Sequence, residues 1–216
     1  MKTYLITGND TGIGKTKVTA TFLKNFISKG FSNIQVIKPV ESGVSSPIEG
    51  DVESILFELG NPTEVTGHTF FTFKKPLSPH TAAEAEGKQV KIADITAAIN
   101  ELPEADIRII EGAGGIATPI NFGGEEWLDL AKELQVDGLI IVIENRLASI
   151  NQARIMERYV KDCGLNCYFW LNEVRMQHSE VLESNYDFIK TMNTPILAKQ
   201  DFEADEPVYS DVDFVS

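Results

Sequence analysis

The stretch Thr7-Gly8-Asn9-Asp10-Thr11-Gly12-Ile13-Gly14-Lys15-Thr16 follows the first apolar run of the chain and determines what fold can be expected. Residues 2–7 have the composition of a short strand, and residues 15–28 carry apolar side chains at helical spacing. Glycines in the intervening loop let backbone N–H groups turn toward an anion, and a helix N-terminus adds partial positive charge. The sequence therefore predicts a strand, a phosphate-binding loop and a helix in succession.

Two side chains at the end of this loop carry its chemistry. Lys15 can reach the outer phosphates of a nucleotide, and the Thr16 hydroxyl can hold Mg²⁺ beside them. The usual motif has four residues between its first glycine and the Gly-Lys pair, whereas five separate Gly8 from Gly14. We interpret the stretch as a slightly longer form of the same loop. The alternative is a glycine-rich turn that only joins a strand to a helix.

Length and charge limit the classes of protein to which the chain can belong. Its 216 residues predict one domain over residues 1–216, in which 199–216 form a loose acidic tail. The formal net charge of −13 opposes binding to nucleic acid or to anionic membranes, so neither is an expected partner. No apolar run approaches the roughly 20 residues that cross a bilayer, and the N-terminus lacks the regions of a signal peptide. We therefore expect a cytoplasmic protein.

Strand and helix patterns alternate through most of the remaining chain. Further strands are predicted at residues 33–37, 107–110, 138–143, 167–171 and 195–198. Further helices are predicted at residues 52–59, 91–102, 127–134, about 150–163 and 179–192. Residues 61–90 are expected to be an irregular surface segment with one edge strand. The pattern predicts an α/β fold: a doubly wound, mostly parallel sheet with helices on both faces, as in phosphate-loop NTPases.

Polar groups are expected near the end of the second strand, at the edge where open α/β sheets bind their ligands. The loop Lys38-Pro39-Val40-Glu41-Ser42-Gly43 is predicted to follow residues 33–37 and brings a lysine and a hydroxyl to this edge. From its position alone, Lys38 is equally well explained as a solvated surface lysine. Asp51 precedes the helix 52–59 and, without further information, is best explained as a helix N-cap.

A third strand end carries a carboxylate beside a glycine-rich loop. The predicted strand 107–110 runs into Glu111-Gly112-Ala113-Gly114-Gly115. In phosphate-loop enzymes a carboxylate at a strand end supports the metal ion, and small residues beside it let the backbone approach phosphate. The alternative is a glutamate that caps an exposed turn. The motif predicts a nucleotide and metal site next to the first loop.

In this order and combination, the motifs resemble those of the dethiobiotin synthetase family. The family's Gly-Thr-Asp-Thr-x-x-Gly-Lys-Thr loop is matched by residues 8–16, and its Lys-Pro-Val-x-Ser-Gly motif by residues 38–43. Its Glu-Gly-Ala-Gly-Gly motif, followed shortly by Thr-Pro, is matched by residues 111–115 and Thr118-Pro119. Ser78-Pro79-His80 and Ile150-Asn151 also resemble the family, and the similarity extends from residue 2 to about residue 198.

The resemblance implies an ATP-dependent ring closure in biotin biosynthesis. The reactants are 7,8-diaminononanoate, CO₂ (or bicarbonate) and MgATP, and the products are dethiobiotin, ADP and phosphate. One amine takes up CO₂ as a carbamate, and a carbamate oxygen attacks the γ-phosphorus to give a mixed carbamic–phosphoric anhydride. The second amine then closes the cyclic urea and expels phosphate. The resemblance also implies a homodimer in which the neighbouring chain completes the diamine site.

Roles for individual residues follow from the same resemblance, which replaces the simpler explanations of Lys38 and Asp51. Lys15 and Lys38 are the expected catalytic residues, and Mg²⁺ is expected on Thr16, Asp51 and Glu111. The expected nucleotide contacts are Gly12, Ile13, Gly14, Lys15, Thr16, Lys17, Asp51, Glu111, Gly112, Ala113, Gly114, Asn172 and Glu173, with Asn172 at the adenine edge. The expected substrate contacts are Thr11, Ser42, Leu147 and Asn151. The helix N-terminus near residues 147–151 suits the substrate carboxylate.

Several positions depart from the family's pattern. Asn9 stands where Thr is usual, Glu173 where Asp is common, and the segment between Ser42 and Asp51 is shorter than in many relatives. Residues 199–203 lack the proline of the family segment that packs on the base, which leaves the preference for adenine open.

Three other functions are less consistent with the sequence. Nucleotide-switch proteins of chromosome or septum partitioning carry an extra lysine early in the phosphate loop, and residues 8–13 contain none. A degenerate domain with a structural role would not be expected to keep Lys15, Lys38 and Glu111. An amide-forming enzyme of cobalamin synthesis would normally carry a glutaminase domain, for which 216 residues are too few.

Overall fold

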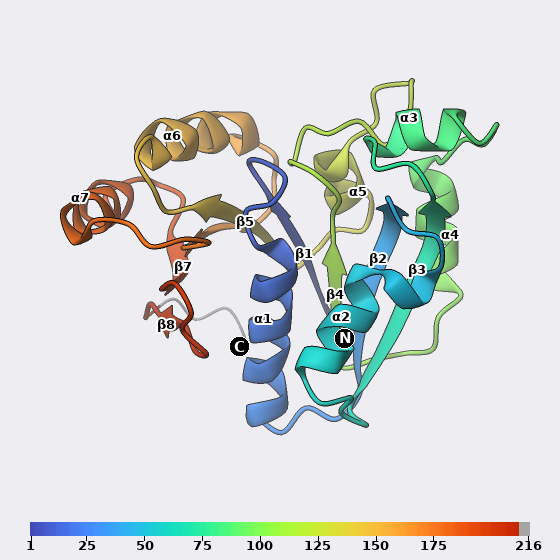
Figure 1. Ribbon diagram of the computed structural model, residues 1–216, viewed down its shortest axis with the longest axis horizontal. Helices are drawn as coiled ribbons and strands as arrows, with labels where there is room; N and C mark the ends of the chain where they lie inside the picture. The colour runs from blue at the N-terminus through green and yellow to red at the C-terminus, as the bar shows by residue number, and fades with distance from the viewer. Residues whose placement is uncertain (212–216) are drawn as a thin grey trace.

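The computed structural model describes residues 1–211, and every strand named in that range belongs to one sheet (Figure 1). The strands are β1 (Lys2–Gly8), β2 (Ile34–Ser42), β3 (Val65–Phe73), β4 (Ile107–Glu111), β5 (Gly138–Glu144), β6 (Cys167–Asn172), β7 (Ile196–Gln200) and β8 (Val208–Tyr209). The helices are α1 (Lys15–Ser28), α2 (Asp51–Glu58), α3 (Pro79–Glu84), α4 (Ile92–Asn100), α5 (Trp127–Glu133), α6 (Ser149–Val160) and α7 (Ser179–Ile189), with a short 3₁₀ helix η1 (Pro47–Glu49).

The strands follow the order β3-β2-β4-β1-β5-β6-β7-β8 across the sheet. The β7–β8 pair is antiparallel and the other pairs are parallel. Central strands such as β5 are buried along their whole length, as parallel strands covered on both faces must be. The predicted doubly wound α/β fold is confirmed. Among residues 1–211, no helix combines the length and apolar composition that spanning a bilayer would need.

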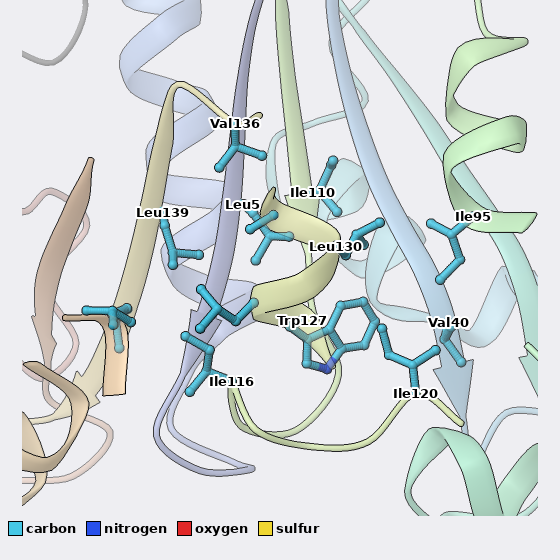
Figure 2. Close-up of a cluster of buried hydrophobic side chains, with 14 of the residues drawn as sticks. Leu5, Val40, Ile95, Ile110, Ile116, Ile120, Trp127, Leu130, Val136 and Leu139 are labelled. Atoms are coloured by element: carbon cyan, nitrogen blue, oxygen red, sulfur yellow. The ribbon is translucent and has the colours of Figure 1, made fainter. Parts of the chain in front are cut away.

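Helices cover both faces of the sheet (Figure 1). On one face, Phe22 of α1 packs edge-on against Tyr4 and Trp170, with ring centroids 5.4 and 6.1 Å apart. On the other face, Trp127 of α5 lies within a cluster of aliphatic side chains that includes Leu5 and Ile110 (Figure 2). Burial of these apolar surfaces holds the helices against the sheet.

The register of the central strands brings distant segments to one edge. Ile6 of β1 pairs with Glu111 of β4, and Ile37 of β2 pairs with Ile110. The carboxyl ends of these parallel strands therefore lie at the same edge of the sheet. This brings together the phosphate loop, Lys38 and the glycine-rich loop after Glu111.

The bounds of α1 agree with the prediction, but β2 is longer than predicted. Residues 38–42, expected to form a loop, continue the strand because β2 pairs with β3 as far as Ser42 and Phe73. Pro39 lies beyond the last pair between β2 and β4, where its missing N–H costs no ladder hydrogen bond. Lys38 therefore lies within a strand segment that is paired with β3.

Within residues 61–90, the predicted edge strand is confirmed as β3, which lies at the edge of the sheet. The same range also contains α3, which the sequence analysis does not predict. Pro79 is the first residue of this helix, and Ala82 and Ala83 are its buried side chains besides the proline. A six-residue helix buried through small residues leaves too weak an apolar pattern to be recognised.

Two details of the C-terminal part differ from the prediction. α6 ends at Val160, so Cys163, expected on this helix, lies beyond its end. The expected loose tail from residue 199 does not begin there, because Lys199 belongs to β7 and pairs with Val208 of β8. Residues 212–216 of that tail lie outside the described residues.

Candidate active site

A cavity of about 400 Å³ opens where the phosphate loop meets the ends of β2 and β4. The sequence-predicted residues that line it are Thr11, Gly12, Gly14, Lys15, Thr16, Lys38, Ser42, Asp51, Glu111, Ala113 and Gly114. They come from four separate segments of the chain, and the sheet brings them together at one edge. A further lining residue, Glu41, is not assigned by the sequence analysis.

The phosphate loop turns on two glycines. Gly12 and Gly14 have φ angles of 73° and 81°, in the left-handed region that glycine adopts without strain. A Cβ atom on Gly14 would also clash with the side chain of Asn172, so no larger residue fits. Gly14 is the N-cap of α1, and the first turn of α1 has no acidic residue to compete with a bound anion.

Lys15 is held inside this loop. Its side chain is buried, and Nζ donates a hydrogen bond of 2.7 Å to the carbonyl oxygen of Asp10. Burial, reinforced by the charge of Lys38, lowers the pKa of Lys15 to about 8 despite the nearby carboxylates. A phosphate anion beside Lys15 would favour its charged form and offset the cost of burial.

Lys38 lies between two carboxylates. Its Nζ is 2.6 Å from Oδ2 of Asp51 and 2.9 Å from Oε1 of Glu111. Burial opposes the charged form of Lys38, but the two carboxylates outweigh it and raise the pKa above its usual range. Burial likewise opposes the charged form of Asp51, and the ammonium of Lys38 outweighs it and lowers the pKa of that carboxyl. Lys38 and Asp51 are thus both held in their ionised forms, and Glu111 lies within ion-pair distance of the same ammonium.

Two hydroxyls of α1 orient Glu111, which is almost fully buried. Thr16 Oγ1 donates to Oε1 of Glu111 at 3.0 Å, and Thr19 Oγ1 donates to Oε2 at 2.7 Å. Thr19 is not among the site residues predicted from the sequence. Its spacing of three residues from Thr16, on the same side of the helix, is the signal that could have identified it.

The oxygen atoms around Lys38 fit a magnesium site. Residues 1–211 contain no group of three His, Cys, Asp or Glu side chains that would hold a metal ion by themselves. Mg²⁺ at phosphate sites needs only one or two carboxylates, because substrate phosphates and water complete its octahedral shell. Thr16, Asp51 and Glu111 supply hard oxygen ligands of this kind, and the Asp51 side chain remains 36% exposed.

The loop after β4 is fixed to both the phosphate loop and α5. The backbone N–H of Ile116 donates to the carbonyl of Gly8 at 2.7 Å, and Trp127 Nε1 donates to the carbonyl of Ala113 at 2.7 Å. A Cβ atom on Gly112 would lie 3.0 Å from the Trp127 ring, so a larger residue there would require the ring to shift by a few tenths of an ångström. The backbone of this loop is therefore held in place beside the cavity.

Glu41 is a buried carboxyl group at the cavity wall. Its exposed fraction is 5%, and its Oε2 accepts a hydrogen bond of 3.0 Å from the backbone N–H of Asp51. Burial raises the pKa of the Glu41 carboxyl to about 7, although the charge of Lys38 opposes the shift. Sequence reasoning missed Glu41 because it occupies the variable position of the Lys-Pro-Val-x-Ser-Gly motif.

Comparison with known proteins identifies the family. A family model described as an AAA domain matches residues 2–198. The ATP-dependent dethiobiotin synthetase BioD of Bacillus velezensis is 34% identical over 206 residues, which cover 91% of this chain and 85% of the relative. The protein of the same name from Legionella pneumophila subsp. pneumophila is 30% identical over 94% of each chain. The chain belongs to the dethiobiotin synthetase family.

Solved structures with the same fold include partition and septum proteins. The ParA family ATPase of Chlorobium tepidum superposes with a TM-score of 0.57 at 15% identity, covering 94% of this chain and 84% of that chain. The MinD cell division protein of Aquifex aeolicus gives a TM-score of 0.53 at 14% identity, covering 94% and 83%. At this identity the likeness concerns the fold alone, and the dethiobiotin synthetase relatives distinguish this chain from the switch proteins weighed above.

Three nucleotide contacts expected around the phosphate end, Ile13, Lys17 and Gly112, are not among the residues that line the cavity. Ile13 is buried beneath the loop. Lys17 points to α2, where its Nζ donates to Oε1 of Glu58 at 2.8 Å.

Two further expected nucleotide contacts, Asn172 and Glu173, also lie apart from the cavity. Asn172 is buried, and its Nδ2 donates to the carbonyl of Ile13 at 2.8 Å. This bond joins β6 to the phosphate loop. Glu173 accepts a hydrogen bond of 3.3 Å from the backbone N–H of Phe202. Asn172 is the last residue of β6 and Glu173 follows it, so both lie on the opposite side of β1 from Lys38 of β2.

Leu147 and Asn151 line a different cavity, of about 510 Å³, beside the N-terminus of α6. Ala148, between them, has a φ of 84°, a left-handed conformation that is strained for a residue with a Cβ atom. Of the expected substrate contacts, the chain thus brings Thr11 and Ser42 to the phosphate cavity and places Leu147 and Asn151 elsewhere.

Proposed function

We propose that the chain forms dethiobiotin from 7,8-diaminononanoate, CO₂ and MgATP, releasing ADP and phosphate. Its membership of the dethiobiotin synthetase family supports this activity and its place in biotin biosynthesis. The observation that carries the proposal is Lys38, whose ammonium lies between two carboxylates in the cavity lined by the phosphate loop. A charged lysine at that point would lie beside the γ-phosphate of ATP and the carbamate that accepts the phosphoryl group.

Phosphoryl transfer needs charge neutralisation and in-line alignment more than a nucleophilic side chain. The N–H groups of the phosphate loop and Lys15 would bind the β- and γ-phosphates. Lys38 would stabilise the carbamate formed on one amine and the charge that develops on the γ-phosphate as a carbamate oxygen attacks. In the mixed anhydride that results, phosphate is the leaving group. The second amine displaces it and closes the cyclic urea.

Thr16, Asp51 and Glu111 would hold Mg²⁺, which supplies further neutralisation of the phosphate charges. Thr19 would keep Glu111 turned toward this position through its hydrogen bond to Oε2. The ammonium of Lys38, bonded to the same two carboxylates in this structure, would then be free to turn toward substrate oxygens.

The diamine site would be completed by a second copy of the chain. Leu147 and Asn151 line a cavity that is separate from the phosphate cavity, which supports a contribution across a homodimer. The N-terminus of α6 would bind the substrate carboxylate through its N–H groups and partial positive charge. Thr11 and Ser42 of the first chain would contact the diamine end. Asn172 remains the proposed contact of the base, and Glu173 remains a proposed contact of the nucleotide.

The test is phosphate release by the purified chain with MgATP and bicarbonate, in the presence and absence of 7,8-diaminononanoate. Release that requires both bicarbonate and diamine, with dethiobiotin detected by mass spectrometry, is the expected result. GTP and CTP, tested beside ATP, would report the base preference. ATP hydrolysis that is indifferent to the diamine would contradict the proposal.

A further inference from the structure

Glu41 is the ionisable side chain of the cavity to which the mechanism above gives no role. It is 5% exposed and shares the cavity wall with Lys38, Ser42 and Asp51. Its Oε2 accepts the backbone N–H of Asp51 at 3.0 Å. A neutral backbone donor does not compensate the burial of a negative charge, because a buried carboxylate needs a cationic partner as well.

The cations of the cavity are already engaged elsewhere. Lys38 is paired with Asp51 and Glu111 at 2.6 and 2.9 Å, and Nζ of Lys15 donates to the loop carbonyl of Asp10. The ion pairs within 4.0 Å that residues 1–211 form do not include Glu41. In the described residues, Glu41 therefore has no cation within 4.0 Å, although the charge of Lys38 reaches it, and it lies in the same cavity wall as the proposed substrate contact Ser42.

Among the reactants, the diamine alone carries positive charge, since CO₂ is neutral and the nucleotide is anionic. Two neighbouring ammonium groups repel each other, so one amine of the pair loses its proton much more readily than the other. At neutral pH one amine is therefore free to take up CO₂ while its neighbour remains an ammonium. A single carboxylate at the diamine end would match that charge.

We propose that the carboxylate of Glu41 binds the ammonium group of the diamine and so determines the enzyme's selectivity for an amine-bearing substrate. This inference rests on the proposed function. The ammonium would supply the cationic partner that Glu41 lacks, and the pair would orient the free amine toward Lys38. Glu41 then serves ligand binding in addition to accepting the N–H at the start of α2.

The competing explanation is a purely structural role. The N-cap residue of α2 is Gly50, which has no side chain to accept a hydrogen bond from the first turn. Glu41 accepts the backbone N–H of Asp51 instead. Glu41→Gln keeps an oxygen acceptor for this N–H and removes the charge. Glu41→Ala removes both. Glu53→Gln, an exposed position on α2, is the matched control for the loss of one negative charge.

The experiment measures ligand binding to the 216-residue protein by calorimetry with MgADP present. The ligands are 7,8-diaminononanoate and nonanoate, which has the same carbon chain and carboxylate but no amines. We expect Glu41→Gln to weaken diamine binding about 10- to 100-fold, the range for a lost charged hydrogen bond. Binding of nonanoate and of MgADP should be unchanged in that variant, and Glu53→Gln should bind all three ligands as the parent does.

Equal affinity of the parent and Glu41→Gln for the diamine would overturn the role of Glu41 and leave the proposed function standing. A loss of MgADP affinity in Glu41→Gln, with diamine binding retained, would likewise overturn it in favour of a structural role at Asp51. If the parent protein itself does not bind the diamine, both the proposed function and the proposed role of Glu41 are contradicted.

Discussion

The phosphate end of the site and the segment 147–151 differ in how completely a single chain builds them. At the phosphate end, side chains from β2, α2, β4 and α1 bond directly to one another around Lys38 and Glu111. In the segment 147–151, Leu147 is 76% exposed and faces a cavity shared with α7. One region is a closed set of mutual contacts, and the other is a surface.

This difference has a physical cause. Buried charges must be paired within the chain, because an unpaired charge in the interior costs several kcal/mol, roughly 3–5 when one partner of a buried pair is lost. The segment 147–151 offers mainly backbone N–H groups and apolar surface. These groups can remain hydrated until a ligand or a second chain binds, so they need no partner within the chain. We therefore expect variants at the phosphate end to affect both folding and catalysis, and variants in the segment to affect them separately.

The largest effect is expected for Lys38→Ala. Loss of the ammonium leaves the buried Glu111 carboxylate without its cation, which should lower the free energy of unfolding by about 3–5 kcal/mol. Diamine-dependent phosphate release should fall about 10³-fold, because a group that stabilises developing charge is lost. Denaturant unfolding and phosphate release would be measured on the same preparation, with Lys24→Ala, at a partly exposed position of α1, as control. Near-normal phosphate release by a folded Lys38→Ala chain would separate Lys38 from catalysis.

A smaller effect is expected for Thr19→Val. The change keeps the shape of the side chain and removes the donor to Oε2 of Glu111, which costs about 1–3 kcal/mol for a buried acceptor left unsatisfied. Since Glu111 is a proposed Mg²⁺ ligand, the Mg²⁺ concentration for half-maximal activity should rise about 10- to 100-fold.

Thr21→Val is the matched control for Thr19→Val. It is the same change on the same helix, but the Thr21 hydroxyl accepts from Gln200 and lies away from Glu111. It should affect stability alone. A Thr19→Val enzyme with unaltered Mg²⁺ dependence would mean that Glu111 does not need this orientation.

The smallest effect is expected for Ala148→Gly in the segment. Ala148 has a φ of 84°, which glycine adopts without the cost of about 1 kcal/mol that a Cβ atom incurs. The melting temperature should rise by about 2–4 °C, while MgADP affinity stays unchanged. Ala97→Gly, at an exposed helical position of α4, should instead lower stability by about 1 kcal/mol. A lower melting temperature for Ala148→Gly would contradict the strain assigned to this position.

The sequence predicted the elements with strong periodicity and the chemistry that lies in contiguous motifs. The bounds of α1 follow from its apolar spacing, and Lys15, Thr16 and Glu111 follow from their loops. The end of β2 was predicted to be a loop, because proline usually interrupts a strand and Pro39 lies in this segment. Its pairing with β3 on the side away from β4 could not be deduced from local sequence.

The residues that sequence reasoning missed act through contacts between distant segments. Thr19 matters because Glu111, 92 positions later, lies against α1. Glu41 matters because the N-terminus of α2 returns to the end of β2. Asn172 has a further contact of this kind: the resemblance implies that it binds the base, and in the structure its Nδ2 donates to the carbonyl of Ile13 in the phosphate loop. Such contacts depend on the packing of the sheet, which no local pattern encodes.

The central claim is that one chain supplies the phosphate end and its neighbour supplies the segment 147–151. Leu147→Asp introduces a negative charge beside the proposed position of the substrate carboxylate and should abolish diamine-dependent activity through repulsion, without loss of MgADP binding. Lys38→Ala should lower activity about 10³-fold by its effect at the phosphate end.

The most direct measurement is the activity of these two variants after unfolding and refolding together. If each site combines residues of two chains, half of the dimers formed at random are mixed and each mixed dimer has one intact site, so about a quarter of the parent activity should return. A mixture that remains as inactive as either variant alone would contradict the claim and place the whole site within one chain.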